Sequence, residues 1–277
     1  MISHFVTFQH FRYLKSAVLI SLGASIAYAV HDSGGHPGGG TWLGYVLGSG
    51  AIALIAWLAW FGIRKRRFKG YGLVHGWLSA HIYLGLSLMV VATLHTGFRF
   101  GWNVHTLAYA LMVVVIMSGA FGAIAYSVLP SLALANRGVQ SLEGIISEIL
   151  SIDREVRELS VALDDKLGSL LADATEPPRF GGNLWHLLTG SVPKCPTALG
   201  LSHIEGVAAS GAVTLEESAA YASLARLLGR KLRLLERARR DLRYRAIRDI
   251  WLFLHVPMTF GLIAALIAHI FSVFFFW

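Results

Sequence analysis

Five long apolar stretches dominate the pattern of hydrophobic and polar positions along the chain. They cover residues 12–30, 42–63, 78–98, 105–129 and 249–276. A helix of about 20 apolar residues is long enough to cross the roughly 30 Å hydrocarbon core of a bilayer. The pattern therefore predicts an all-α membrane protein with five transmembrane helices.

Polar residues divide this membrane protein into three segments. Residues 1–129 hold the first four spans, residues 130–248 form a long hydrophilic insert, and residues 249–277 hold the fifth span. Within the insert, apolar residues spaced by three and four predict a first amphipathic helix. They are Leu142, Ile145, Ile149, Ile152, Val156, Leu159 and Leu163.

A second amphipathic helix is expected to lead from the insert into the fifth span. It would begin at the capping box Thr214–Glu217, where a threonine and a glutamate satisfy the first backbone N–H groups. Its apolar side carries Leu224, Leu228, Leu232, Leu235 and Leu242. We expect residues 174–213 to be a Gly/Pro-rich loop, which makes the insert an antiparallel helical hairpin.

Basic residues are grouped beside the spans in a way that predicts how the chain crosses the membrane. They precede the first span, fill residues 64–69 between the second and third, and recur in residues 226–248 before the fifth. The connections at 31–41 and 99–103 hold one arginine and no lysine. Because cytoplasmic loops are rich in Lys and Arg, we expect the N-terminus and the insert inside a bacterial inner membrane and the C-terminus outside.

Composition agrees with this class and narrows the chemistry. The 277 residues are 55% hydrophobic and only 14% charged, and the net charge of +8 follows from the basic loops. Membrane lipid is therefore the expected partner of the basic residues, and no nucleic acid is expected. The single cysteine, Cys195, excludes a CxxCH haem attachment and a four-thiolate iron–sulfur cluster in this chain alone. We expect it to be a free loop thiol.

The first span has a second interpretation. Its basic start and Ala27-Tyr28-Ala29 resemble a secretory signal with its cleavage site. We favour a helix that is retained. The choice does not affect the functional residues below, which all lie beyond this span.

Four histidines lie inside the apolar spans: His81 and His95 in the third, and His255 and His269 in the fifth. An ionisable side chain at membrane depth is costly, so each is a candidate functional residue. Both pairs have a spacing of 14 residues. At about 100° per residue, that spacing returns to within about 40° of one helix face. It also separates the two histidines by roughly 21 Å along the axis.

The predicted topology decides which histidines meet. The third and fifth spans run in the same direction, so His81 should face His255 near the cytoplasmic side, and His95 should face His269 near the outer side. Small residues on these faces, such as Gly85 and Ala265, would leave room for a flat macrocycle. Two stacked bis-histidine sites are what two b-type haems require.

This arrangement resembles a known family. His-x13-His on two parallel helices separated by one helix is similar to the four-helix dihaem bundle of membrane cytochromes b, found in bc complexes and ferric-reductase-like proteins. The resemblance implies an inner haem b on His81 and His255 and an outer haem b on His95 and His269. Glycines of the second and fourth spans fit the family's close approach of backbone to haem. They are Gly44, Gly48, Gly50, Gly119 and Gly122.

Departures from the family limit the expected function. The chain has no Pro-Glu-Trp/Tyr quinol-oxidation motif and no flavin or NADPH domain. What remains resembles an electron-transfer subunit of an oxidoreductase complex. We expect it to transfer electrons across the membrane between a quinone pool and a redox partner outside the cytoplasmic face, either a partner subunit or a soluble carrier.

Two other functions use the same histidines differently. In a proton or metal transporter, intramembrane histidines would relay protons or bind a cation. In a structural anchor subunit, they would only be satisfied core residues. The matched pairs favour the haem interpretation over both.

Other polar residues near the spans have weaker claims. Arg99 lies one helical turn beyond His95 and could pair with the propionates of the outer haem, or it could extend to the membrane interface. Arg66 and Arg67 could serve the inner haem, although loop charge explains them. His31, His36 and His105 are expected at the outer surface without a committed ligand.

Overall fold

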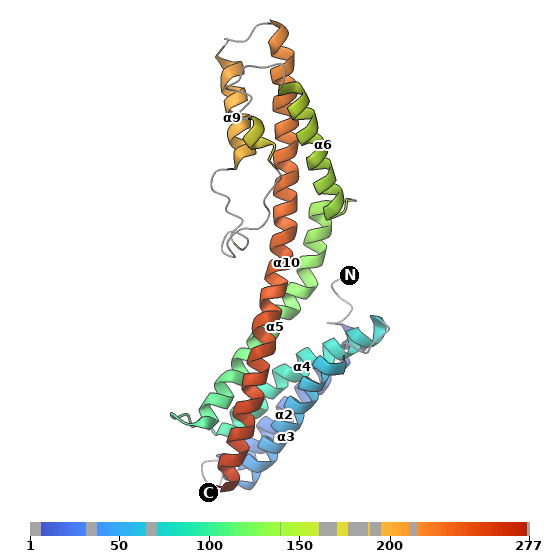
Figure 1. Cartoon of the computed structure of the whole chain (residues 1–277). Helices are drawn as coiled ribbons and strands as arrows, with labels where there is room; N and C mark the ends of the chain where they lie inside the picture. Colours follow the sequence, from blue (N-terminus) through green and yellow to red (C-terminus); the bar gives the residue numbers. More distant parts are fainter. Residues whose placement is uncertain are drawn as a thin grey trace. The chain divides into compact units, whose positions relative to one another are not determined.

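The computed structural model describes residues 7–31, 38–64, 71–138, 140–160, 171–176, 188, 195–210 and 215–275. Helix accounts for 91% of these residues, and no strand occurs among them. The main helices are α2 (Phe8–His31), α3 (Trp42–Arg64), α4 (Tyr71–Thr96), α5 (Val104–Arg137), α6 (Leu142–Ser160), α9 (Pro196–Ala209) and α10 (Leu215–Phe275) (Figure 1). The predicted all-α class is confirmed.

Five of these helices are long and apolar enough to cross a membrane. The qualifying segments are Phe8–His31, Trp42–Gly62, His75–Thr96, Val104–Asn136 and Glu217–Phe275. They include the expected spans, so the prediction of five membrane-spanning helices is supported by length and composition. The last two continue well beyond the apolar stretches.

The end of α5 differs from the expected end of the fourth span at residue 129. The helix continues through Pro130 to Arg137. It stops at Gly138, whose φ of 64° lies in the left-handed region that glycine adopts without steric cost. The Gly138 N–H donates to the carbonyl of Leu134 at 2.9 Å. This is a common way to end a helix, and it places the helix end at a glycine rather than at the proline.

The chain divides into two compact units. The first unit contains Met1–Ser127 and Ile250–Trp277, and the second contains Val128–Asp249. Helices α5 and α10 each contribute to both units. The second unit has nearly the same bounds as the insert expected from the sequence, residues 130–248.

Four helices share the apolar core of the first unit. Its buried residues come from α3, α4, α5 and α10, and they are Leu43, Leu47, Ala51, Ile55, Leu88, Val91, Ala92, Met112 and Leu262. Helix α2 also packs against α4. Most of its large apolar side chains stay exposed, among them Leu19 at 70% and Val30 at 69%. Such a surface is typical of a helix that faces lipid.

The core of the second unit follows the predicted amphipathic pattern. On α6, the buried positions include Leu142, Ile145, Ile149, Ile152 and Val156. Leu159 is 37% exposed, and Leu163 and Thr214 lie outside the described residues. On α10, Leu224, Leu228 and Leu235 are buried, and Leu232 and Leu242 are partly buried.

The expected loop at 174–213 contains a helix, α9, so this part of the prediction was wrong. Pro196 at its first turn is favourable because proline lacks the N–H that would have no partner there. Its buried face is Thr197, Gly200 and Ile204, which offers little hydrophobic signal. A Cβ atom at Gly200 would lie 3.2 Å from the Ala174 Cβ, so the glycine permits close packing. The insert is therefore more than a two-helix hairpin.

A buried ion pair lies in the same core. Lys231 on α10 donates through Nζ to Oδ1 of Asp153 on α6 at 2.5 Å and to the carbonyl of Ala174 at 2.6 Å. Both charged side chains are only 1% exposed. Within the described part of the chain, Asp153 Oδ2 has no hydrogen-bond partner. Lys231 is thus the main compensation for a carboxylate inside an apolar core.

This pair generates a prediction about stability. Lys231→Met should destabilise the protein by about 3–5 kcal/mol, because removing one partner of a buried pair leaves the other charge uncompensated. The double variant Lys231→Met/Asp153→Leu should recover much of the loss, since both charges are gone. Denaturant unfolding of the detergent-solubilised chain, followed by helical circular dichroism, measures both. A double variant as unstable as Lys231→Met would contradict this role.

Candidate functional site

Two of the intramembrane histidines face each other in the first unit. His95 lies near the end of α4 and His269 near the end of α10. Their ring centroids are 6.2 Å apart, and the ring planes make an angle of 77°. Both side chains are partly buried. The outer pair expected from the sequence is therefore brought together.

Helix α3 holds the His95 ring by a backbone hydrogen bond. The Nδ1 atom lies 2.7 Å from the carbonyl oxygen of Gly44. A carbonyl only accepts, so Nδ1 carries the proton and donates it, and Nε2 keeps its lone pair. This is the tautomer needed by a metal ligand bound through Nε2.

Gly48 allows α3 to approach the same ring. A Cβ atom at Gly48 would lie 2.7 Å from Cε1 and 2.9 Å from Nδ1 of His95, too close for any side chain. At Gly50, a Cβ atom would meet nothing within 4 Å. Of these two glycines of the second span, only Gly48 is required by the site.

His105 joins the outer pair, which the sequence did not indicate. It lies in the first turn of α5, and its Nδ1 atom contacts the Nδ1 atom of His269. The ring centroids are 4.4 Å apart with an angle of 85°. One of these nitrogens donates to the other, so His105 can fix the tautomer of His269. The sequence left open whether His105 contacts anything, and the contact arises because the start of α5 packs beside the end of α10.

His255, one of the two inner histidines, is held by a side chain of α5. Its Nδ1 atom lies 2.7 Å from Oγ of Ser118. That hydroxyl donates its only proton to the carbonyl of Val115 at 2.9 Å. If the hydroxyl keeps that proton on Val115, Ser118 Oγ accepts from His255, and the tautomer of His255 then has its proton on Nδ1 and its lone pair on Nε2.

Trp251 completes this part of the site. Its indole Nε1 donates to the carbonyl of Ser118 at 2.7 Å, and its ring lies 5.5 Å from the His255 ring. A Cβ atom at Gly119 would lie 3.4 Å from Cε1 of His255, and one at Gly122 would collide with the Trp251 ring. Gly122 thus lets α5 pack closely against this turn of α10, whereas a side chain at Gly119 would only touch the His255 ring.

His81 lies against an aromatic group on α3. Its ring centroid is 5.1 Å from that of Phe61. Trp77, one turn earlier on α4, stacks on Phe61 at 6.4 Å and on Trp57 at 4.9 Å. His81 and His255 thus each contact a neighbouring helix, α3 and α5 respectively. In the other pair, the rings of His95 and His269 contact each other.

Each of the four histidines contacts the helix that precedes or neighbours its own and that carries no expected ligand. Helix α3 contacts the two histidines of α4, through Gly44 and Phe61. Helix α5 contacts the two histidines of α10, through His105 and Ser118. The helices without expected ligands therefore orient the helices that carry them.

The remaining sequence candidates have other surroundings. Arg99 is exposed, and a Cβ atom at Gly38 would lie 3.9 Å from its Nη1 atom. His31 packs edge-on against Trp42, with ring centroids 5.3 Å apart. His36, Arg66 and Arg67 lie outside the described residues.

Cys195, in the second unit, is free and partly buried at the start of α9. Burial raises the pKa of its thiol, but a hydrogen bond from Arg239 Nη2 to Sγ at 3.6 Å and nearby backbone N–H groups outweigh burial. The net effect lowers the pKa below its ordinary value. The thiol is free and lies outside the helix, as expected, and it also packs against the core and has Arg239 as a charged neighbour.

A conventional metal cluster is not part of this arrangement. Among the residues that the structure describes, no group of three or more His, Cys, Asp or Glu side chains is placed to hold a metal ion. Haem makes a different demand, because its macrocycle supplies most ligands and the protein adds one or two axial side chains.

Comparison of the chain with protein-family models, with curated proteins and with solved structures found no match.

Proposed function

We propose that this chain is a membrane-embedded b-type dihaem cytochrome, an electron-transfer subunit of an oxidoreductase complex. His95 and His269 would hold the outer haem, and His81 and His255 the inner one. The observation that carries the proposal is the contact of His95 with His269, together with the hydrogen bond from His95 Nδ1 to the Gly44 carbonyl, which puts the lone pair of His95 on Nε2.

The spacing of the outer pair fits two axial ligands of one iron. The two imidazoles would hold the haem iron between them, and the haem would supply a one-electron carrier at this level. The distance between His95 and His269 is 6.2 Å. The residues present therefore fit the group at this level.

The inner level is supported by chemistry rather than by a ring-to-ring distance. Nδ1 of His255 is hydrogen-bonded to Ser118, and the His81 ring lies beside Phe61, which itself stacks with Trp77. Aromatic and apolar surroundings exclude water and favour a large flat ligand with a polar edge.

Each residue has a specific task in this proposal. The Gly44 carbonyl accepts a hydrogen bond from Nδ1 of His95, which fixes the ring orientation and increases the basicity of Nε2. Ser118 and His105 would do the same for His255 and His269 when each accepts a hydrogen bond from Nδ1. Gly48 leaves the His95 ring room to keep its position. Bound haem would supply a one-electron carrier at each level.

The two levels make the chain suited to transfer across a membrane. Fourteen helical residues separate the histidines of each pair by roughly 21 Å, which is most of a hydrocarbon core about 30 Å thick. A reaction confined to one side would need only one level. We therefore propose electron transfer between a quinone pool and a redox partner outside the cytoplasmic face, in a bacterial inner membrane with the N-terminus inside and the C-terminus outside.

The contact of His105 with His269 favours a second candidate, a proton pathway. Three imidazoles, those of His95, His269 and His105, are in succession within ring contact. Histidine chains can pass protons through a membrane protein. The dihaem proposal accounts in addition for the inner histidines and for their matched spacing, so it is preferred, and an optical spectrum separates the two.

The first prediction of this proposal is two non-covalent b haems per chain. Purified, fully loaded protein should show a b-type spectrum, and all of its haem should be extracted by acid acetone because no thioether link can form. The pyridine haemochrome assay, divided by protein concentration, measures the ratio. Protein with no haem or with one would contradict the proposal.

The second prediction uses two neighbouring glycines of α3. Gly48→Ala should weaken outer-haem binding by roughly tenfold or more, since overpacking beside His95 costs about 1–3 kcal/mol. Gly50→Ala is the matched control and should leave both haems unchanged, because its Cβ atom meets nothing within 4 Å. His269→Ala should remove the outer haem while more of the inner haem remains.

Redox titration of each variant, with haem content measured in parallel, separates the two levels. If Gly48→Ala and Gly50→Ala behaved alike, His95 would not be the ligand that the close approach of α3 protects.

The third prediction concerns the direction of transfer relative to the membrane. In sealed vesicles, a quinol analogue should reduce the protein, and an impermeant acceptor on the opposite side should then be reduced. His269→Ala should reduce the transmembrane rate at least about tenfold, while His203→Ala, at an exposed position of α9, should not. Failure of any quinol to reduce haem-loaded protein would exclude the quinone pool and favour a relay fed by partner proteins.

A further inference from the structure

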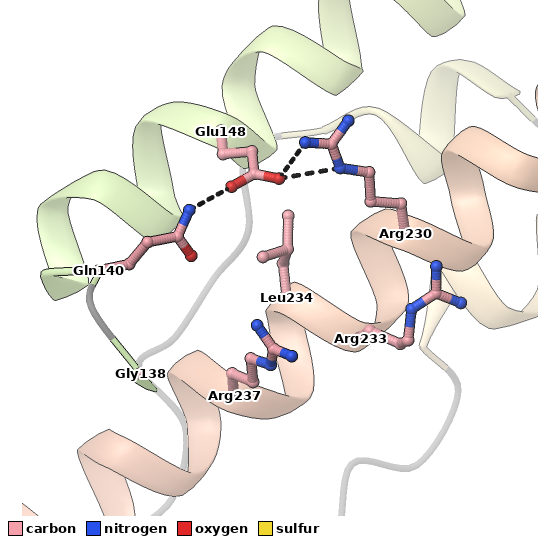
Figure 2. A pocket seen from close by; sticks show the side chains of 7 residues that line it. All are labelled: Gly138, Gln140, Glu148, Arg230, Arg233, Leu234 and Arg237. Atoms are coloured by element: carbon pink, nitrogen blue, oxygen red, sulfur yellow. Dashed lines mark hydrogen bonds and ion pairs between the residues drawn. The ribbon is translucent and has the colours of Figure 1, made fainter. Parts of the chain in front are cut away.

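A cavity in the second unit is lined by more positive than negative side chains. Its volume is about 400 Å³, and it lies between α10, α6 and the segment before α6. Its polar lining residues are Gln140, Glu148, Arg230, Arg233 and Arg237. Figure 2 shows Glu148 of α6 facing Arg230, with the other two arginines on successive turns of α10.

Glu148 supplies the one carboxylate among the lining residues, and it already has hydrogen-bond partners within the protein. Arg230 donates to Oε1 of Glu148 through Nε at 2.9 Å and Nη2 at 2.6 Å. Gln140 donates from Nε2 to Oε2 at 2.7 Å. The Gln140 hydrogen bond is the largest of the effects that lower the pKa of Glu148; burial opposes them, and Arg230 and the nearby charge of Arg237 add to them. Glu148 is therefore ionised at neutral pH, and both of its oxygens are used.

Two guanidinium groups remain for a ligand. Arg230, Arg233 and Arg237 follow the i, i+3, i+7 spacing that places side chains on one helix face. Within the described residues, neither Arg233 nor Arg237 makes a side-chain hydrogen bond or an ion pair. Three arginines against one glutamate leave an excess of two positive charges in the cavity lining.

The charge and the geometry define the ligand. Guanidinium groups match phosphate oxygens with two parallel hydrogen bonds, which makes arginine the preferred residue for phosphate recognition. A dianionic phosphate monoester would balance the two excess charges. The cavity volume also lies in the range of small-molecule sites, about 300–1,000 Å³.

We propose that this cavity binds a phosphate-bearing anion, held by Arg233 and Arg237 beside the fixed Glu148–Arg230 pair. Arginines are expected on any cytoplasmic loop, but loop charge alone does not require a cavity that places them around one occupied carboxylate. The ligand can be free phosphate or the phosphomonoester headgroup of a lipid, because both present the same chemistry. The proposal is independent of the haem function.

The test compares two double variants with equal loss of charge. Arg233→Gln/Arg237→Gln removes the guanidinium groups of the cavity. Arg226→Gln/Arg240→Gln is the control, because both of its arginines are exposed on α10 and neither lines the cavity. Detergent-solubilised full-length protein is titrated calorimetrically with inorganic phosphate and, separately, with a short-chain phosphatidic acid at constant ionic strength.

The cavity variant should bind at least about tenfold more weakly than the unaltered protein, because hydrogen bonds to charged groups are the strong ones. The control variant should change by less than about threefold. Binding of inorganic phosphate identifies free phosphate as a sufficient ligand, and binding of phosphatidic acid alone identifies a lipid headgroup. Arg233→Lys/Arg237→Lys keeps the charge without the guanidinium fork and should bind with intermediate affinity.

The proposal is overturned if neither probe binds the unaltered protein. It is also overturned if the two glutamine double variants lose affinity equally, since the effect would then be general charge. Circular dichroism and the unfolding midpoint of each variant confirm that folding is retained, and the lysine variant decides the question if the glutamine cavity variant unfolds.

Discussion

A histidine inside an apolar helix bundle has two ring nitrogens that have lost their contact with water. Leaving a buried donor without an acceptor costs about 1–3 kcal/mol, so the position of the acceptor decides how each ring is oriented. His95 donates to the Gly44 carbonyl, and Nδ1 of His255 shares a hydrogen bond with the Ser118 hydroxyl. The rest of the candidate site depends on these two bonds, because they hold both rings in place and, for His95, determine which nitrogen can bind a metal.

The bonds also explain the composition of the helices between the histidines. A backbone carbonyl can reach an imidazole only where the helix that carries it approaches closely, and Gly48 makes that approach possible for α3 and His95. Ser118 combines a short side chain with an oxygen, and Trp251 in turn binds its carbonyl. Small residues on α3 and α5 are therefore part of the site, although none of them would touch a metal.

In the second unit, the buried polar groups that need a partner are charged side chains. Lys231 and Asp153 neutralise each other in the apolar core, and Arg230 and Glu148 do so at its edge. Beyond these pairs, α10 has more positive charge than α6 can balance, and the cavity beside Glu148 collects part of the excess. Charge that is paired in the core contributes to one folded arrangement, and charge left unpaired at the surface is available to a ligand.

The sequence by itself determined the helical class, the five long apolar helices and the shared face of each histidine pair, because hydrophobicity and helical period are local properties. It also indicated the buried faces of α6 and α10. Helix α9 was not predicted, since a buried face of threonine, glycine and isoleucine gives too little apolar signal. The hydrogen-bond partners of the histidines could not be predicted for a different reason. Gly44 is 51 residues from His95, Ser118 is 137 from His255, and His105 is 164 from His269. A carbonyl, a serine and a terminal histidine have no pattern that links them to a ring so distant in the chain, and only the packing of α3 against α4 and of α5 against α10 brings them within hydrogen-bonding distance.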